Sequence, residues 1–197
     1  MLLDADECQL VLVDYQVKLM PEIAGHEIVI ANALRLGRVA QLLDIPVWGT
    51  EENPGGLGPN VPEVRSLCLT TLPKMHFSAC ADGLVELLRP RQQQGGNARS
   101  LPKHLQKPAA PARTSVVIAG CETHVCLMQT ALDLLDEEFE VWVVTDACGS
   151  RTDRNRDAAY DRLAAAGAEL VTTEMAAFEW LRTAEHPQFK EVLSLVK

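Results

Sequence analysis

Residues Thr114–Cys126 read TSVVIAGCETHVC, and this stretch decides the fold. The run TSVVIA combines β-branched and apolar residues over the length of a strand and ends at Gly120. Residues 123–138 then place apolar side chains on one helical face, and Thr123 is a good N-cap for such a helix. A buried strand that turns directly into an amphipathic helix is typical of an α/β protein.

The rest of the chain repeats this alternation. Apolar runs predict strands at residues 9–13, 46–50, 67–72, 114–119, 140–145 and 169–172. Helical periodicity predicts helices at residues 28–43, 79–88, 123–138, 153–166 and 175–183, followed by a C-terminal tail. Such strands separated by helices indicate a parallel sheet covered on both faces. We therefore predict a single three-layer α/β/α domain over residues 1–197, Rossmann-like, with a six-stranded parallel sheet in the order 3-2-1-4-5-6.

The composition limits the possible functions. The formal net charge of −9 argues against a general affinity for nucleic acids or anionic membranes. No stretch approaches the ~20 apolar residues of a membrane helix. Residues 1–6 contain two acidic residues and no basic one, unlike a secretory signal. We expect a cytoplasmic protein with no membrane partner, and import into an organelle stays open.

The cysteines do not form a recognisable metal or disulfide pattern. No two of them have the CxxC spacing, and most lie in or beside apolar runs, where cysteine behaves as a small hydrophobe. A chain of this length also has enough core to fold without a disulfide framework. We predict no cofactor and no metal. The six residues are Cys8, Cys68, Cys80, Cys121, Cys126 and Cys148.

Residues 89–113 interrupt the alternation of strands and helices. They contain four prolines, six basic residues and no acidic residue. Such a composition buries little apolar surface, so we expect a mobile, solvated surface insertion. The alternative is a docking site for an anionic partner.

A carboxylate and a thiol are predicted to converge where the strand order reverses. Ligands bind there in open parallel sheets, and strands 1 and 4 are neighbours at that point. Strand 1 leads into Asp14, and strand 4 leads to Cys126 in the first turn of a helix. The positive helix end favours a thiolate. Lys74, which follows strand 3, would favour it too, although most lysines are solvated surface groups. Because Asp14 opposes this effect, we expect a moderately lowered pKa for Cys126.

Several segments carry a resemblance to a known family. They are DYQ at residues 14–16, KMHFS at 74–78 and GCETHVC at 120–126 followed by QTALD at 129–133. With VVTDAC at 143–148 and HPQFK at 186–190, they resemble the isochorismatase-like cysteine hydrolase superfamily, in the branch of isochorismatase domain-containing proteins. The similarity runs from about residue 8 to the end, apart from residues 89–113.

The resemblance implies a role for each matching residue. Cys126 matches the nucleophile, Asp14 the general base and Lys74 the third member of a catalytic triad. The bond between Cys121 and Glu122 matches a cis peptide bond, and the backbone N–H groups of Glu122 and Cys126 match an oxyanion hole. Cys121 is the competing nucleophile, but it lies at the strand end, before the helix.

Departures from the family pattern narrow the chemistry. Nicotinamidase members carry an Asp-x-His metal motif after strand 2, whereas residues 50–58 read TEENPGGLG here and contain no histidine. Isochorismatases proper act on a vinyl ether and lack the cysteine. The resemblance therefore implies a metal-independent hydrolase that acts on a small amide or related carbonyl compound, on C–N bonds other than peptide bonds, through a thioester.

Two functions other than a hydrolase remain open. The alternatives are a nucleic-acid-binding or ribonuclease-like protein that uses residues 89–113, and a non-catalytic scaffold of the same fold. The resemblance and an acidic surface also suggest an even-numbered homo-oligomer.

Five residues are candidates for the substrate pocket. Three of them have another interpretation: Tyr15 and Phe77 could be core aromatics, and His124 could be a solvated residue. The pocket candidates are Tyr15, Gln16, Phe77, Thr123 and His124.

Overall fold

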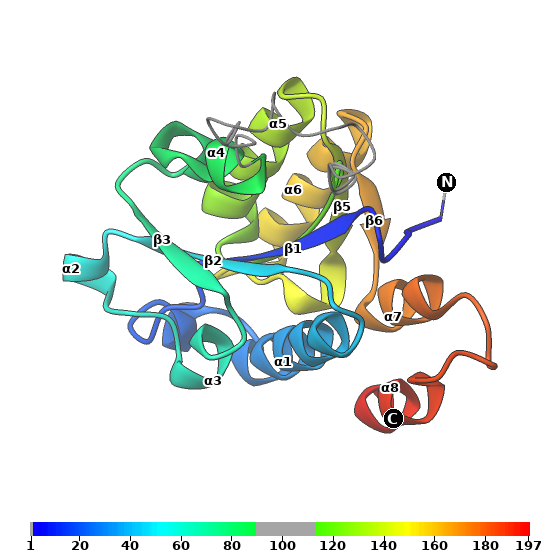
Figure 1. The fold of residues 1–197 in the computed structure, drawn as a ribbon. Helices are drawn as coiled ribbons and strands as arrows, with labels where there is room; N and C mark the ends of the chain where they lie inside the picture. Colours follow the sequence, from blue (N-terminus) through cyan, green and yellow to red (C-terminus); the bar gives the residue numbers. More distant parts are fainter. Residues whose placement is uncertain (1, 90–112) are drawn as a thin grey trace, which may run out of the picture.

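The computed structural model describes residues 2–89 and 113–197 (Figure 1). Six strands form one parallel sheet in the order β3-β2-β1-β4-β5-β6, which confirms the predicted topology. The predicted insertion at 89–113 lies almost wholly outside the described residues. The strands are β1 (Cys8–Val13), β2 (Val47–Glu52), β3 (Thr70–Lys74), β4 (Ser115–Gly120), β5 (Glu140–Val144) and β6 (Glu169–Val171).

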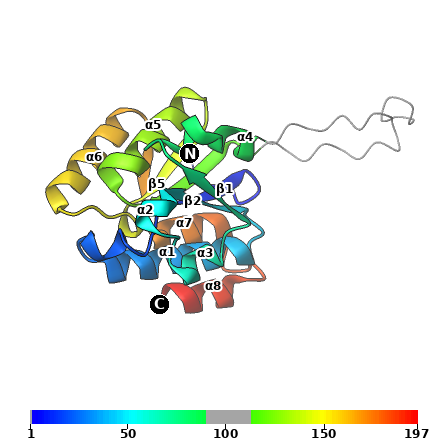
Figure 2. The same ribbon diagram turned by 90° about the vertical axis from the view of Figure 1, so that its left-hand side faces the viewer.

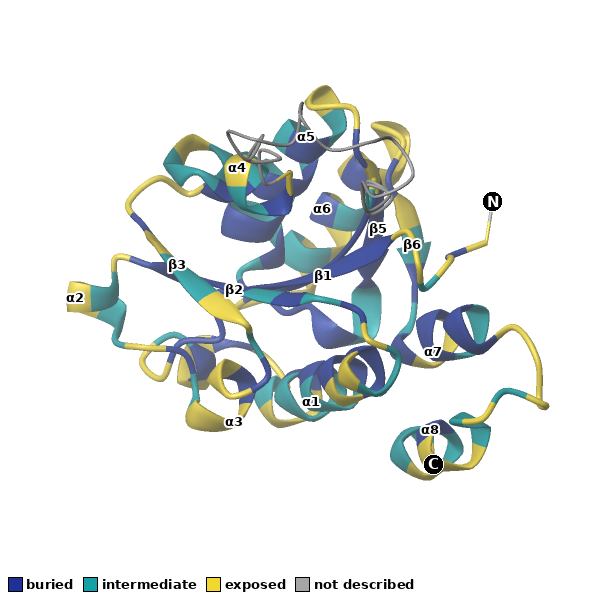
Figure 3. Ribbon diagram, viewed as in Figure 1, coloured by how far each residue is buried: buried dark blue, intermediate teal, exposed yellow. Residues whose placement is uncertain are grey.

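The two central strands are buried along their whole length. All six residues of β1 and all six of β4 are buried, because helices cover both faces of the sheet at its middle. Figure 3 shows this buried centre and the exposed outer faces of the helices. Apolar residues on both faces of a strand fit a parallel sheet that is covered on both sides.

Helices form one layer on each face of the sheet (Figure 2). In Figure 1, α4, α5 and α6 lie on one face, and α1, α3, α7 and α8 lie on the other. Contacts between α5 and α6, and between α1 and each of α3, α7 and α8, hold these layers together. The helices are α1 (His26–Leu42), α2 (Pro54–Leu57), α3 (Pro62–Arg65), α4 (Leu84–Leu88), α5 (Met128–Asp136), α6 (Asp153–Ala165), α7 (Thr173–Leu181) and α8 (Phe189–Val196).

Three local features differ from the sequence prediction. The helix expected at 79–88 is split into a 3-10 turn, Ala79–Asp82, and α4, because Gly83 takes a φ of 104° between them. The helix expected at 123–138 begins with a π-helical turn, Thr123–Leu127. The predicted tail contains α8, which packs on α1 and α7. Within residues 2–89 and 113–197, no helix is long and apolar enough to cross a membrane.

Candidate active site

The register of the central strands places the candidate residues at one edge of the sheet. Val13, the last residue of β1, pairs with Thr50 of β2 on one side and with Gly120 of β4 on the other. Asp14 follows directly, with a positive φ of 53° that turns the chain out of the strand. On the far side of β2, Glu52 lies opposite Lys74, the last residue of β3. The carboxyl ends of four neighbouring strands therefore meet here.

Gly120 allows β4 to approach the end of β1 closely. Its φ of 151° is unfavourable for other residues, and a Cβ atom at this position would overlap the backbone carbonyl of Val13. A larger residue would push apart the two strand ends that carry Asp14 and the turn to Cys126. Glycine is thus required by the convergence that the sequence predicts.

Lys74 lies between two carboxylates. Its Nζ is 2.8 Å from Oδ2 of Asp14 and 2.8 Å from Oε2 of Glu52. The same ammonium donates to the backbone carbonyls of His76 (3.3 Å) and Phe77 (3.1 Å). The other oxygen of Asp14, Oδ1, accepts a hydrogen bond of 2.7 Å from the hydroxyl of Thr50. These contacts fix the Asp14 carboxylate and the Lys74 ammonium in one orientation.

The charges around Lys74 keep it protonated. Burial alone would lower its pKa, but the charge of Asp14 and hydrogen bonds to Asp14 and Glu52 outweigh burial and raise the pKa above 10.5. Lys74 therefore stays cationic at neutral pH. Two carboxylates and one ammonium leave this cluster with a formal charge of −1.

Cys126 lies beside both carboxylates. Its Sγ and one carboxylate oxygen each from Asp14 and Glu52 lie within 4.8 Å of one another. Cys126 belongs to the π-helical turn before α5, and 6% of its surface is exposed. The structure thus brings together the three residues that the resemblance assigns to a triad, with Glu52 as a fourth.

The expected lowering of the Cys126 pKa is wrong. Burial raises the pKa of the thiol, the charge of Asp14 raises it further, and Lys74 offsets only part of this effect. The start of the helix also differs from the prediction. Glu122 is the N-cap instead of Thr123, and Thr123 is the first residue of a π-helical turn. Cys126 is therefore a thiol in the resting protein, and a nearby base must take its proton before or during attack.

Gln16 supports the end of β2 rather than an open pocket. Its side chain is buried and accepts a hydrogen bond of 2.9 Å from the backbone N–H of Glu52. Its amide nitrogen donates to the carbonyls of Glu52 (2.8 Å) and Gly58 (2.6 Å). Every one of these contacts is with backbone, so Gln16 holds Glu52 in place.

Other residues of the matching segments join the Lys74 loop to the Cys126 helix. The hydroxyl of Ser78 donates to the carboxylate of Asp133 on α5. One residue on, the backbone N–H of Ala79 donates to the hydroxyl of Thr130, also on α5, at 3.0 Å. These two contacts position the loop after β3 against the helix that follows Cys126.

The remaining pocket candidates fall into two groups. Tyr15 is fully buried, and its hydroxyl donates to the carbonyl of Ala147 at 2.5 Å, so it is a core aromatic. Thr123 is also fully buried. Phe77, in contrast, is 53% exposed beside Lys74. His124 is half-buried, with Nδ1 3.0 Å from the hydroxyl of Ser150. Of these four, only Phe77 and His124 have surface that a ligand can reach.

The turn between β4 and Cys126 contains the cis peptide bond that the resemblance implies. The peptide bond between Cys121 and Glu122 is cis. The side chain of Glu122 points to Arg151, whose Nε lies 2.7 Å from its carboxylate. Cys121 is fully buried, and burial raises its pKa well above the ordinary value. Cys121 is therefore poorly placed to compete with Cys126 as a nucleophile.

The same residues form a set of possible metal ligands. Asp14, Glu52 and Cys126 offer two carboxylate oxygens and a sulfur, a donor set that a divalent ion such as zinc can accept. The Lys74 ammonium already contacts both carboxylates, however, and a metal ion bound between them would meet a like charge. We interpret the cluster as centred on lysine.

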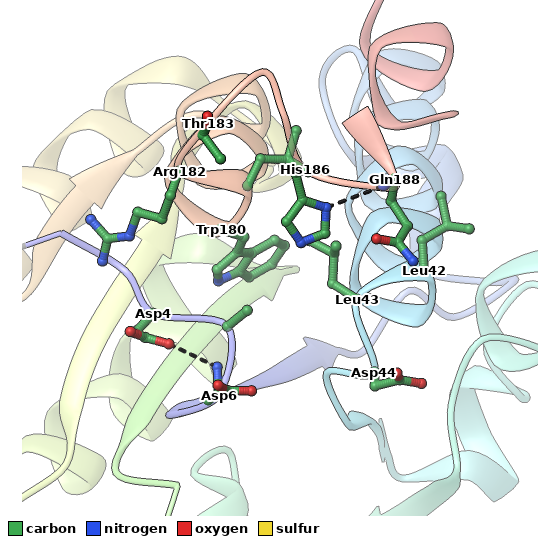
Figure 4. Close-up of a pocket in the computed structure, with 12 residues that line it drawn as sticks. Asp4, Asp6, Leu42, Leu43, Asp44, Trp180, Arg182, Thr183, His186 and Gln188 are labelled. Atoms are coloured by element: carbon green, nitrogen blue, oxygen red, sulfur yellow. Dashed lines mark hydrogen bonds between the residues drawn. The ribbon is translucent and has the colours of Figure 1, made fainter. Parts of the chain in front are cut away.

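A cleft lies at the other end of the strands, away from Cys126 (Figure 4). It has a volume of about 410 Å³ between the segment before β1 and the ends of α1 and α7. None of the residues around Cys126 lines it. Its lining includes Asp4, Asp44, Trp180, Arg182 and His186.

Glu52 is the site residue that the sequence analysis missed. The strand was predicted to end at Thr50, and the residues beyond it were judged only for a metal motif. In the structure β2 continues to Glu52, so Thr50 and Glu52 point to the same face of the strand. The signal in the sequence is that Glu52 follows Thr50 by two residues. If the strand continues, Glu52 shares a face with Thr50, at the end of strand 2.

Comparisons with known proteins show the family of this chain. The family model of the isochorismatase domain matches residues 8–175. Isochorismatase domain-containing protein 2B of Mus musculus is 38% identical over 188 residues, which are 95% of this chain and 80% of that protein. Among solved structures, the MAR1 ribonuclease of Caenorhabditis elegans is 30% identical with a TM-score of 0.84, covering 100% of this chain and 92% of that one.

A bacterial protein is similar as well. The YcaC gene product of Escherichia coli, described as an octameric hydrolase of unknown specificity, is 25% identical with a TM-score of 0.80. The similarity covers 98% of this chain and 95% of that one. The fold, the extent of the family match and the identity to the mouse protein lead to one conclusion: this chain belongs to the isochorismatase domain family.

Proposed function

We propose that this protein is a cysteine hydrolase that cleaves a small amide or related carbonyl compound, with Cys126 as nucleophile. The observation that carries the proposal is the position of the Cys126 thiol beside an Asp14 carboxylate that is itself paired with Lys74. The family match and the YcaC similarity support a hydrolase. The bond cleaved and the triad are parts of the proposal.

The mechanism uses Asp14 to move one proton. As the sulfur of Cys126 attacks the carbonyl carbon, Asp14 accepts the thiol proton. We assign Oδ2 to this role, because Oδ1 accepts the hydrogen bond of Thr50, whereas Oδ2 is ion-paired with Lys74 and accepts no hydrogen bond. The negative charge on the substrate oxygen is held by the backbone N–H groups of Glu122 and Cys126. The amine leaves with the proton from Asp14, and water then hydrolyses the thioester.

Lys74 keeps Asp14 ready for this role. A buried carboxylate with no counter-ion would be costly, and it would disfavour formation of a second negative charge on sulfur. The Lys74 ammonium offsets both effects at 2.8 Å. Phe77 and His124, the two accessible candidates, complete the proposed pocket.

A screen with trapping of the intermediate tests the proposal. Small amides and related carbonyl compounds are incubated with the wild type and with Cys126→Ala, and product formation is measured. Reactions are quenched in acid and analysed by mass spectrometry for an acyl group on the Cys126 peptide. We expect turnover and an acyl adduct only in the wild type. Equal turnover by Cys126→Ala would refute the proposal.

A ribonuclease is the second candidate, because three similar structures, from Caenorhabditis elegans and two Leishmania species, bear that name. Two carboxylates against one ammonium give the site a formal charge of −1, which disfavours a phosphodiester, and a thiol is better suited to a carbonyl carbon. Incubation with labelled RNA at low and moderate salt tests this alternative. RNA cleavage that Cys126→Ala or Asp14→Asn abolishes would favour it over the amidase.

Assembly and location form part of the same proposal. The octameric state of YcaC supports an even-numbered homo-oligomer here, and light scattering that shows only monomer would contradict it. All six cysteines are free, which fits the reducing cytoplasm. The substrate screen also tests the alternative of a non-catalytic scaffold of the same fold.

A further inference from the structure

Only two of the four clustered side chains have surface that solvent reaches. The side chains of Asp14 and Lys74 have no exposed surface. Cys126 is 6% exposed, and the side chain of Glu52 is 11% exposed. A molecule that approaches the sulfur from solvent therefore meets the Glu52 carboxylate, which is the charged side chain of this cluster with exposed surface.

One oxygen of Glu52 is available for such a contact. Oε2 is held by Lys74 at 2.8 Å. Among residues 2–89 and 113–197, Lys74 at Oε2 is the donor that hydrogen-bonds to this carboxylate, and the other oxygen, Oε1, accepts no hydrogen bond. Gln16 holds the backbone of Glu52 through its N–H and its C=O, and Lys74 holds Oε2, so the position of Oε1 is restrained as well. A fixed, partly desolvated acceptor discriminates strongly between ligands with and without a matching donor.

We propose that Glu52 selects substrates that carry an N–H group on the scissile carbonyl, so that the preferred substrates are primary or secondary amides rather than esters. This inference rests on the proposed function. When sulfur bonds to the carbonyl carbon, the amide nitrogen is one further bond away. One carboxylate oxygen of Glu52 lies within 4.8 Å of the sulfur, so this side chain borders the space that the nitrogen enters, and we assign Oε1 as the acceptor of its hydrogen bond.

In the proposed reaction Glu52 acts only as a hydrogen-bond acceptor, and every bond and proton is accounted for without it. The S–C bond forms as the thiol proton moves to Asp14, and the C–N bond breaks as that proton moves to the leaving nitrogen. Water then converts the thioester into a carboxylic acid and restores the thiol. Glu52 accepts an N–H hydrogen bond and undergoes no net protonation. An ester would instead turn an oxygen lone pair toward the carboxylate, which is repulsive.

Matched substrates and variants test the inference. The amide that turns over fastest in the screen is compared with the methyl ester and the N,N-dimethylamide of the same acid. Glu52→Gln keeps the size of the side chain and removes the charge, and Glu52→Asp keeps the charge. The control is Glu51→Gln, because Glu51 is buried one residue away and accepts from the backbone of Asn60 at 2.8 Å without contacting Lys74.

We expect Glu52→Gln to lower the ratio of kcat/KM for the N–H amide to kcat/KM for the ester at least tenfold, beyond any loss that both substrates share through the contact of Glu52 with Lys74. Glu52→Asp should restore part of the amide preference, and Glu51→Gln should leave the ratio unchanged. An equal loss on amide and ester in Glu52→Gln would overturn the inference. If Cys126→Ala is inactive and this ratio does not move, the inference fails while the proposed function stands.

A labelling experiment gives a second readout that needs no known substrate. Iodoacetamide carries the N–H group and methyl iodoacetate lacks it, and both alkylate cysteine. The ratio of their rates at Cys126, measured by peptide mapping, cancels the effect of Glu52 on the pKa of the thiol. We expect Glu52→Gln to reduce the iodoacetamide preference at least threefold. An unchanged ratio counts against the inference.

Discussion

The Asp14 carboxylate and the Lys74 ammonium form an ion pair of 2.8 Å from which solvent is fully excluded. A buried pair of this kind contributes little net stability when intact, but removing one partner leaves an uncompensated charge. Here the effect of losing the lysine is larger, because Glu52 also depends on it. Stability and catalysis therefore both depend on Lys74.

Lys74→Met should destabilise the protein by about 3–5 kcal/mol and abolish turnover. The side chain keeps its length, but Asp14 and Glu52 then face each other without a cation. Urea denaturation at pH 7 measures the loss. The control is Lys190→Met, because Lys190 is exposed on α8 and should change stability by less than about 0.5 kcal/mol. Similar stabilities for the two variants would show that the buried pair has no such role.

Asp14→Asn should make Cys126 react with iodoacetamide at lower pH while turnover is lost. The charge of Asp14 helps to raise the pKa of this thiol, so removing it lowers the pKa and increases the thiolate fraction at a given pH. Lys74→Met should have the opposite effect on labelling, because Lys74 lowers this pKa. Peptide mapping after brief labelling between pH 7 and 10 follows all six cysteines.

The partly exposed Cys68 and Cys80 serve as internal references for this experiment. Their labelling should be the same in the wild type and in both variants. If Cys126 labelling also stays constant, or if Cys121 or Cys148 responds instead, the assignment of the nucleophile is wrong.

Thr50→Val should reduce turnover about tenfold and stability by about 1–3 kcal/mol. The change removes the 2.7 Å hydrogen bond to Oδ1 of Asp14 and leaves a buried acceptor without its donor. The orientation of the carboxylate toward Cys126 is then less restricted, so the effect should appear in kcat more than in KM. Thr50→Ser keeps the hydroxyl and should retain most of the activity. Equal losses in the two variants would show that packing, not the hydrogen bond, matters.

Dialysis against EDTA should leave the hydrolytic activity unchanged. The Lys74 ammonium sits between the carboxylates that a metal ion would need, and a cation bound there would be repelled. Activity after dialysis and metal analysis of the dialysed protein are the measurements. A loss that a single divalent ion restores would show that the cluster is a metal centre instead.

The sequence predicts the sheet and the convergence at its edge because those depend on strong local signals. Apolar strands such as TSVVIA, alternating with amphipathic segments, determine the sheet order and place Asp14 next to the turn that carries Cys126. The spacing alone gives only weak evidence for a functional role of Lys74, because most lysines lie at the surface. Its place between Asp14 and Glu52 depends on the register of β2 with β3, which a single sequence does not specify.

The features that the sequence could not predict depend on burial and on strand ends. Whether the thiol of Cys126 is favoured or disfavoured as an anion is a balance between a helix end, Lys74, Asp14 and desolvation. Only the structure shows that desolvation is the largest of these. Tyr15 was equally ambiguous, because an aromatic residue after a strand fits a pocket or a core until the partner of its hydroxyl is known.

The buried thiols should make the protein less stable at alkaline pH. Burial raises the pKa of Cys8 to about 11 and that of Cys148 to about 12, from an ordinary value of 9.0. Below pH 9 both states are protonated, so the thiols do not oppose folding there. Between about pH 9 and each folded pKa the unfolded chain releases protons that the folded chain retains. The free energy of unfolding should then fall by about 1.4 kcal/mol per pH unit for each fully buried thiol.

Urea denaturation at pH 7, 9 and 10.5 with a reductant present measures this slope. Cys148→Ala removes one such thiol and should make the slope shallower by that amount. A slope that is the same in the variant would mean that Cys148 ionises as readily in the folded protein as in the unfolded chain.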